Sequence, residues 1–105
     1  MSAGFVPVLV LDELRVGEQK VVQIAARRIL LCRTEQAVHA IDWLCPHSFQ
    51  PLLGAKVANG VIRCPKHGAC FELATGKPVN GVTNESVATY PTRLNAGWIE
   101  IEVPS

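Results

Sequence analysis

Two short segments that each pair a cysteine with a histidine constrain this chain more than any other feature. Cys45-Pro46-His47 is followed, after 16 intervening residues, by Cys64-Pro65-Lys66-His67. Each segment carries a proline, which favours a loop over the interior of a strand. Asn59-Gly60 lies between the segments and predicts a tight hairpin turn. We therefore expect two loops at hairpin distance that present two sulfur and two nitrogen donors to one metal centre.

The donor types restrict the metal that such a centre can hold. Thiolates are soft ligands that select iron–sulfur, zinc or copper(I) over magnesium or calcium. A single zinc ion would take Cys45, His47, Cys64 and His67 in a closed tetrahedron. A [2Fe–2S] cluster would take both cysteines on one iron and both histidines on the other. The donor residues alone leave both centres open.

At these residues the chain resembles the Rieske iron–sulfur family, whose pattern is Cys-x-His, a spacer of similar length, and Cys-x-x-His. The resemblance extends to the residues that flank the two loops, namely His39-Ala40-Ile41-Asp42, Leu52, Gly54, Gly68-Ala69-Cys70-Phe71-Glu72 and Thr75-Gly76-Lys77. It implies one [2Fe–2S] cluster with Cys45, His47, Cys64 and His67 as its metal ligands. It also implies a cluster-binding subdomain of two loops at about 44–73.

The rest of the chain has the pattern of an all-β protein. Short runs rich in Val, Ile and Leu alternate with turn signals, and no segment repeats apolar residues at helical spacing for three turns. We expect strands at 6–10, 20–25, 28–33, 37–43, 56–58, 61–63, 69–73, 87–92 and 98–103, and one helical turn at 12–14. These elements predict a small antiparallel β-sandwich or barrel, and the resemblance implies one of the Rieske type.

Length and charge bound the organisation and the partners. With 105 residues and no linker-like segment, the chain is expected to form a single domain over 1–105. Ten Lys and Arg against nine Asp and Glu argue against a strongly basic surface for nucleic acid. Apolar runs such as Ile29–Cys32 are far shorter than a membrane span, and residues 1–5 lack the pattern of a signal peptide. We therefore expect a cytoplasmic protein with reduced thiols.

Five further residues are expected to have structural roles. Cys32 lies in an apolar run and is expected to be an inert buried thiol. Cys70 follows the second loop, but strand alternation should turn its side chain away from the metal centre. His39 is expected to pack or to lie on the surface without a role in the site. Trp43 and Trp98 are expected to be core aromatics, with shielding of the centre as an alternative for Trp43.

The resemblance also bears on the reduction potential. High-potential members of the family carry an extra cysteine in each loop, at the places of Gln50 and Lys66 in this chain. They also carry a Ser and a Tyr whose hydroxyls reach the cluster, at the places of Ala69 and Phe71. We therefore predict a potential near the bottom of the family's range of about −150 to +300 mV.

One departure concerns the cover of the cluster. Related carriers often have Gly-Pro soon after the Thr-Gly turn, and its proline caps the cluster. Asn80-Gly81-Val82 stands there in this chain. We expect either another nearby residue or Pro78 to take over this role.

The motifs that are missing point to an electron carrier. A mononuclear iron site needs two histidines and a carboxylate, and only His39 remains after the four ligands are assigned. There is no G-x-G-x-x-G fingerprint for a dinucleotide. The resemblance implies a ferredoxin, not an enzyme, that carries one electron from a flavin-dependent NAD(P)H reductase to the terminal oxygenase of a multicomponent aromatic-ring dioxygenase. Two alternatives remain, a small Rieske subunit of a larger oxidoreductase such as nitrite reductase and a zinc-stabilised interaction module.

The resemblance also implies how such a carrier meets its partners. His47 and His67 would lie at an exposed tip and serve as entry and exit points for electrons. Four apolar residues are expected to form a small docking face around them, namely Pro46, Phe49, Pro51 and Pro65. We expect a monomer that docks transiently, with no nucleic acid and no membrane among its partners.

Overall fold

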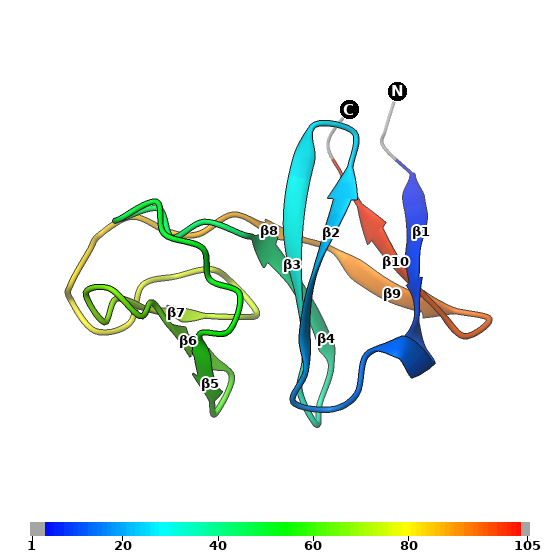
Figure 1. Cartoon of the computed structure of the whole chain (residues 1–105), viewed down its shortest axis with the longest axis horizontal. Coiled ribbons are helices and arrows are strands. Elements are labelled where there is room, and N and C mark those ends of the chain that lie inside the picture. The colour runs from blue at the N-terminus through cyan, green and yellow to red at the C-terminus, as the bar shows by residue number, and fades with distance from the viewer. Residues whose placement is uncertain (1–3, 104–105) are drawn as a thin grey trace.

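The computed structural model describes residues 4–103 and contains three antiparallel sheets (Figure 1). The elements are β1 (Phe5–Val10), η1 (Leu11–Glu13), β2 (Gln19–Ile24), β3 (Arg27–Arg33), β4 (Val38–Asp42), β5 (Lys56–Ala58), β6 (Val61–Arg63), β7 (Cys70–Glu72), β8 (Thr89–Tyr90), β9 (Thr92–Asn95) and β10 (Trp98–Glu102). The strand orders are β1-β10-β9, β2-β3-β4-β8 and β5-β6-β7. The predicted all-β antiparallel fold is confirmed. No helix within residues 4–103 is long and apolar enough to cross a membrane.

The sheet β2-β3-β4-β8 is the middle layer and is covered on both faces. Ile29 and Leu31 of β3 belong to the core shared with β1 and β10, whereas Leu30 and Cys32 belong to the core shared with β5, β6 and β7. Because successive side chains of a strand point to opposite faces, β3 supplies apolar residues to both cores. This double burial explains why its sequence is a continuous apolar run instead of an alternating one.

The β5-β6-β7 sheet and the loops around it form one end of the molecule (Figure 1). Asn59 and Gly60 have φ angles of 53° and 75°, as the predicted type I′ turn requires. The buried side chains of Ile62 and Phe71 face each other across β6 and β7 and belong to the core that contains Leu30, Cys32 and both loop cysteines. This hairpin therefore sets the distance between the two loops.

A glutamine joins this end of the molecule to the middle sheet. The side chain of Gln19 in β2 donates to the carbonyl of Ala55 at 2.7 Å and accepts from the N–H of Gly54 at 2.7 Å. The side-chain amide of Gln19 thus uses both its nitrogen and its oxygen to join the two parts. The contact fixes residues 54–55, which follow the first loop, against the middle sheet.

Two predictions about the C-terminal strands are wrong. The expected strand 87–92 is divided at Pro91 into β8, which pairs with β4, and β9, which pairs with β10. Proline lacks the N–H that a continuous ladder needs, so the chain changes sheets there. Trp98 is 44% exposed instead of buried, because the alternation of β10 places Ile99 and Ile101 in the core.

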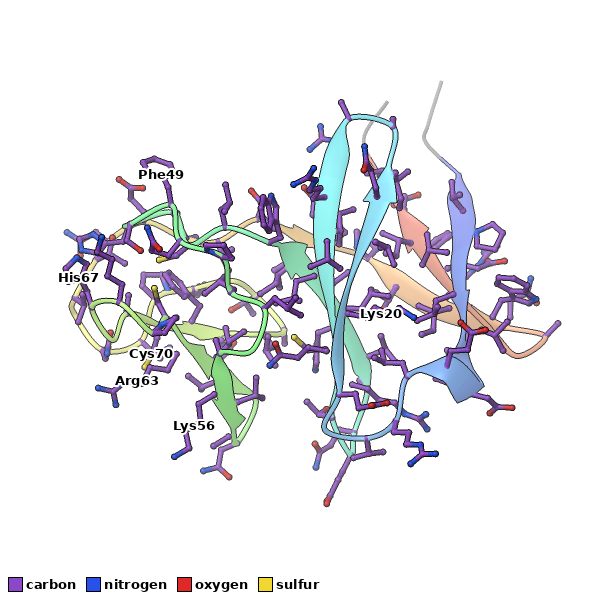
Figure 2. All side chains as sticks on the ribbon, in the orientation of Figure 1. Lys20, Phe49, Lys56, Arg63, His67 and Cys70 are labelled. Atoms are coloured by element: carbon purple, nitrogen blue, oxygen red, sulfur yellow. The ribbon has the colours of Figure 1, made fainter. Side chains whose placement is uncertain are left out.

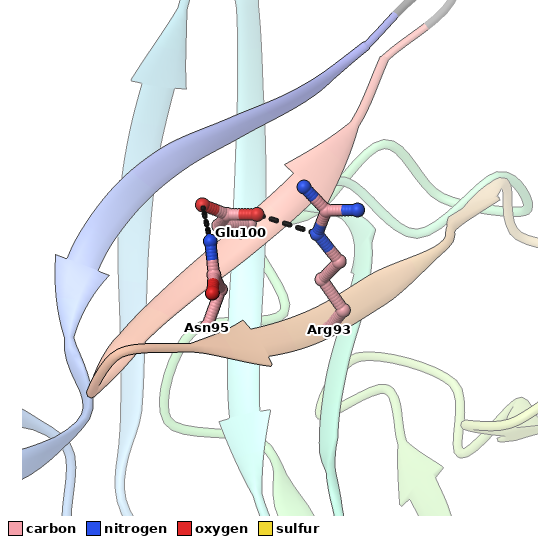
Figure 3. Close-up of polar contacts among 3 residues, drawn as sticks. All are labelled: Arg93, Asn95 and Glu100. Carbon is pink, nitrogen blue, oxygen red and sulfur yellow. Dashed lines mark hydrogen bonds and ion pairs between the residues drawn. The ribbon is translucent and has the colours of Figure 1, made fainter.

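A polar array lies on the β1-β10-β9 sheet (Figure 3). Arg93 Nε donates to Glu100 Oε1 at 2.5 Å, and Asn95 donates to Glu100 Oε2 at 3.3 Å. The guanidinium of Arg93 also lies 4.3 Å from the centroid of the Phe5 ring. The hydrogen bond from Arg93, supported by Asn95 and by the Arg93 charge, outweighs desolvation and lowers the pKa of the Glu100 carboxyl. The array thus links all three strands of this sheet.

Candidate metal centre

The two predicted loops have the same pattern of backbone hydrogen bonds, which we call the frame of each loop. In the first, Cys45 N–H donates to the carbonyl of Gln50 at 2.9 Å, and Phe49 N–H donates to the carbonyl of Cys45 at 2.7 Å. In the second, Cys64 N–H donates to the carbonyl of Ala69 at 2.8 Å, and Gly68 N–H donates to the carbonyl of Cys64 at 3.0 Å. Each loop thus begins at a cysteine and closes on it four and five residues later.

In each loop, a residue soon after the histidine has a left-handed backbone conformation. Gly68 has a φ of 74°, which glycine adopts without strain. Phe49 holds the equivalent position with a φ of 55°, where a bulky side chain is a conformational outlier. The positive φ turns the backbone of each loop back toward its cysteine. It therefore leaves His47 and His67 at the tips of the loops.

The structure brings the four predicted ligands together as two pairs. Cys45 and Cys64 are 0% and 1% exposed and lie within one apolar core. His47 and His67 are exposed, and their ring centroids lie 5.6 Å apart with the planes at 74°. The sulfur pair is therefore inside and the imidazole pair outside, and His67 lies at one end of the molecule (Figure 2).

The surroundings of Cys64 favour its thiolate form. Burial by itself raises the pKa of the Cys64 thiol, but hydrogen bonds to the sulfur outweigh it and lower the pKa. The Ser48 hydroxyl is the first of these donors, with Oγ 3.4 Å from Cys64 Sγ. The other donors are the backbone of Lys66, the Cys45 thiol and the backbone of His67. A thiolate is the form of cysteine that ligates metal.

This donor set suits a binuclear cluster. Within residues 4–103, no group of three or more His, Cys, Asp and Glu side chains lies close enough to hold a single metal ion. The donors form a sulfur pair and a nitrogen pair, and a cluster with two cysteines on one iron and two histidines on the other requires such a division. The residues present therefore fit a [2Fe–2S] group, which would be held between the paired loops.

Ser48 is a residue of the candidate site that the sequence did not reveal. Ala69 and Phe71 are both 0% exposed and, as predicted, bring no hydroxyl to the site. Ser48 follows His47 directly, and this position beside a predicted ligand is the only feature of the sequence that points to it. Its contact with Cys64 depends on how the two loops meet, so it could not be read from either loop alone.

Asn80 begins Asn80-Gly81-Val82, the segment for which we expected another nearby residue or Pro78 to take over the cover of the cluster. Its Nδ2 donates to the carbonyl of Gly68 at 2.6 Å, and its Oδ1 accepts from the N–H of Cys70 at 3.2 Å. The side chain thus holds the end of the second loop from outside. Asn80 braces the loop through hydrogen bonds instead of covering the site with an apolar ring.

The other singled-out residues lie outside the four-residue set. Cys32 is buried, and desolvation raises the pKa of its thiol to about 12. Cys70 is half-buried, and its thiol donates to the carbonyl of Gly68 at 3.4 Å, whereas Phe71 beside it faces the core. His39 is half-buried in β4, and desolvation lowers the pKa of its imidazole. Trp43 packs against the core of the sulfur pair, with the guanidinium of Arg28 5.2 Å from its ring centroid.

Three sequence relatives match between 61% and 92% of the chain. It is 36% identical to apoptosis-inducing factor 3 of Mus musculus over 64 residues, which are 61% of this chain and 11% of that protein. It is 30% identical over 98 residues to the ferredoxin component of the alkene monooxygenase system of Xanthobacter autotrophicus, covering 92% of this chain and 80% of that protein. It is 26% identical over 94 residues to the ferredoxin component of the naphthalene 1,2-dioxygenase/salicylate 5-hydroxylase systems of Ralstonia sp, covering 90% of each. The chain thus spans about a tenth of the first relative and most of the other two.

Solved structures share the fold over the whole length. The ferredoxin of carbazole 1,9a-dioxygenase from Nocardioides aromaticivorans IC177 superposes with a TM-score of 0.88 at 25% identity, covering 98% of this chain and 100% of that one. The nitrite reductase small subunit of Mycobacterium tuberculosis superposes with a TM-score of 0.87 at 21% identity, covering 98% and 97%. At 21% identity, the second likeness shows the fold alone.

The family itself follows from a match over most of the chain. The Rieske [2Fe-2S] domain family matches residues 4–91, which include both loops and all but the last strands of the fold. This match confirms the resemblance predicted from the Cys-x-His and Cys-x-x-His segments. It also favours the [2Fe–2S] cluster over a zinc ion as the cofactor. The chain belongs to the Rieske [2Fe-2S] domain family.

Proposed function

We propose that the chain is an electron-transfer ferredoxin that serves the terminal oxygenase of a multicomponent aromatic-ring dioxygenase system. The observation that carries this proposal is the arrangement of a buried cysteine pair beneath an exposed histidine pair at one end of the molecule. The full-length relatives that are ferredoxin components of oxygenase systems support it. An NAD(P)H-dependent flavoprotein reductase is proposed as the electron donor.

The proposal assigns the cluster ligands as Cys45, His47, Cys64 and His67. It treats 1–105 as one Rieske domain, with a cluster-binding part at about 44–73. The bound group supplies a one-electron redox couple. Burial of both cysteines keeps water away from the sulfur side. Because the imidazoles are exposed, the loop tips are where a partner can approach the site most closely.

The tip has the character of a small transient interface. Phe49 is 72% exposed, and Pro51 and Pro65 are also exposed. Redox encounters bury little surface and dissociate quickly. A monomer that docks through this tip is therefore proposed, and it acts as a carrier and not as a catalyst.

A bound subunit is the second candidate. The likeness to the nitrite reductase small subunit rests on the fold, whereas the likeness to free ferredoxin components extends over the sequence. A carrier should elute as a free monomer from gel filtration of the native protein. Elution in a stable high-mass complex with a reductase subunit would favour the second candidate.

The proposed function is tested with the purified holoprotein. Iron and inorganic sulfide should be present in equal amounts, and the visible absorption should bleach and recover through a one-electron titration. After anaerobic reduction, the protein should be reoxidised on mixing with the carbazole 1,9a-dioxygenase oxygenase from Nocardioides aromaticivorans in a stopped-flow experiment. A colourless zinc protein, or a centre that cannot be cycled, would rule the proposal out.

A further inference from the structure

We propose that the loop tip is a docking surface with a cationic rim and one aromatic anchor, and that it fits a redox partner whose docking site is acidic around an apolar recess. This inference rests on the proposed function and names the chemistry of the partner. The rim is Arg63 and Lys66, and the anchor is Phe49. Phe49 and Arg63 lie at the same end of the molecule as His67 (Figure 2), and Lys66 precedes His67 in the loop.

Positive charge is concentrated in the cluster-binding end of an almost neutral chain. Residues 44–88 contain Glu72, Glu85 and four cations, whereas the rest of the chain has six cations against seven carboxylates. The four cations are Lys56, Arg63, Lys66 and Lys77, and all are exposed. In the part of the chain that the structure describes, the ion pair found joins Arg93 to Glu100, on another sheet. The cations at this end are therefore available to a partner.

Two of these cations flank the second histidine. Lys66 precedes His67 in the loop. Arg63 lies over the residue that follows it, since a Cβ built on Gly68 would be 3.0 Å from Arg63 Nη2. Glu72, one of the two carboxylates of this end, lies at the end of β7 that leads away from the loop, where its Oε1 accepts from the Thr75 hydroxyl at 2.8 Å. A partner that approaches the imidazole of His67 therefore meets the positive charges of Arg63 and Lys66.

Phe49 extends the surface on the side of the first loop. Its ring is 72% exposed, so burial does not stabilise it, and its φ of 55° is unfavourable for a bulky residue. The frame of the first loop holds it there through the bond from Phe49 N–H to the carbonyl of Cys45. A strained backbone that presents an unburied aromatic ring is typical of a functional contact. Aromatic residues are also the usual anchors at the centre of protein interfaces.

The charge of the rim determines the kind of partner. Long-range steering by a net charge of +1 is weak, but charges at the contact itself select partners of opposite sign. Carboxylates placed around an apolar recess would pair with Arg63 and Lys66 while the recess receives Phe49. A basic docking site would instead place like charges against each other.

The test compares electron transfer from the reduced holoprotein to oxidants of opposite charge. Fe(III)–EDTA is an anion and hexaamminecobalt(III) a cation. The ratio of their rate constants cancels any change in driving force between variants. The ratio should fall as salt is added to the native protein, because salt screens exposed charges. In R63E/K66E, the ratio at low ionic strength should fall by about tenfold.

The matched control is R15E/K20E, which changes the net charge equally but alters exposed cations outside residues 44–88 (Lys20, Figure 2). Its ratio should stay within about twofold of the native value. A second pair of probes, acidic cytochrome b5 and basic cytochrome c, extends the test to protein surfaces. The native protein should reduce the acidic one faster at low salt, and F49S should reduce it more slowly without a change in the Fe(III)–EDTA rate.

The outcomes separate the inference from the proposed function. Equal responses of R63E/K66E and R15E/K20E, or a preference for cytochrome c, would overturn the cationic docking surface while leaving an electron carrier. An unaltered rate to cytochrome b5 in F49S would remove Phe49 from that surface. Failure of the native protein to pass an electron to any of the four oxidants would instead refute the proposed function.

Discussion

The Ser48 hydroxyl oxygen lies 3.4 Å from the sulfur of Cys64 and joins the two loops of the metal centre. A hydrogen bond to a ligand sulfur stabilises the more negative, reduced state of an iron–sulfur centre. We therefore predict that Ser48→Ala lowers the midpoint potential by roughly 20–60 mV, which corresponds to one hydrogen bond of about 0.5–1.5 kcal/mol. Protein-film voltammetry measures this shift.

The control for this prediction is Ser86→Ala, because Ser86 is exposed and has no contact with the loops among the hydrogen bonds of residues 4–103. It should leave the potential unchanged. The native potential itself should stay below about +100 mV, because Ala69 and Phe71 supply no further hydroxyl. A Ser48→Ala potential equal to the native one would show that the contact does not affect the redox state.

The sequence predicted those parts of the fold that depend on local chemistry. Asn59-Gly60 specified a type I′ turn, and that turn determined the hairpin between the loops. The spacing of the two Cys/His segments indicated which side chains lie near one another, because the segments precede and follow one hairpin. The apolar run of β3 indicated a buried strand, although only the structure showed that it serves two cores.

The parts that sequence could not predict depend on contacts between distant segments. The change of sheet at Pro91 arises because β4 and β10 lie in different layers. The exposure of Trp98 follows from the register of β10, since a shift by one residue would reverse which side chains are buried. The left-handed backbone of Phe49 has no sequence signal, because a bulky residue is normally disfavoured there.

Phe49→Gly should not reduce stability, although it removes a large apolar side chain. The ring is 72% exposed, so little burial is lost, and glycine adopts a φ of 55° without strain. We expect the free energy of unfolding to stay equal or rise by up to about 1 kcal/mol. Phe49→Val is the comparison, since a β-branched residue keeps the strain and should be less stable than Phe49→Gly in urea titrations. The opposite order would mean that the ring contributes to packing.

Asn80→Ala should loosen the second loop. The variant removes the bonds to Gly68 and Cys70, each of which contributes about 1 kcal/mol, so unfolding should become easier by about 1–2 kcal/mol. Amide exchange at Cys70 should also quicken, because its N–H loses its acceptor. Asn84→Ala, an exposed asparagine on the same segment, is the control. Unchanged exchange at Cys70 would argue against the brace.

Gly76 is expected to be the most sensitive glycine of the cluster-binding end. A Cβ at this position would lie 2.0 Å from the carbonyl oxygen of Val87, whose N–H also donates to the carbonyl of Gly76 at 2.9 Å. Gly76→Ala must displace the backbone of residues 87–88, so we expect a loss of on the order of 3 kcal/mol. Gly81→Ala has a similar φ of 78° but nothing within 4 Å of its Cβ, so it should lose only about 1 kcal/mol. Equal losses would show that the φ angle, and not the contact with Val87, dominates.

Glu100 should make the free energy of unfolding depend on pH in the acid range. The pKa of its carboxyl is lowered from 4.5, chiefly by the hydrogen bond from Arg93. Because the folded pKa lies below the unfolded one, the carboxylate stabilises the fold above pH 4.5, and this stabilisation is lost as the pH falls through the lowered pKa. Glu100→Gln should therefore be less stable than the native protein at pH 7, with the difference shrinking below pH 4.5. Glu102→Gln, whose carboxylate forms no ion pair within residues 4–103, is the control. A Glu100→Gln difference that stayed constant from pH 7 into the acid range would show that the hydrogen bonds of Glu100 do not depend on its charge.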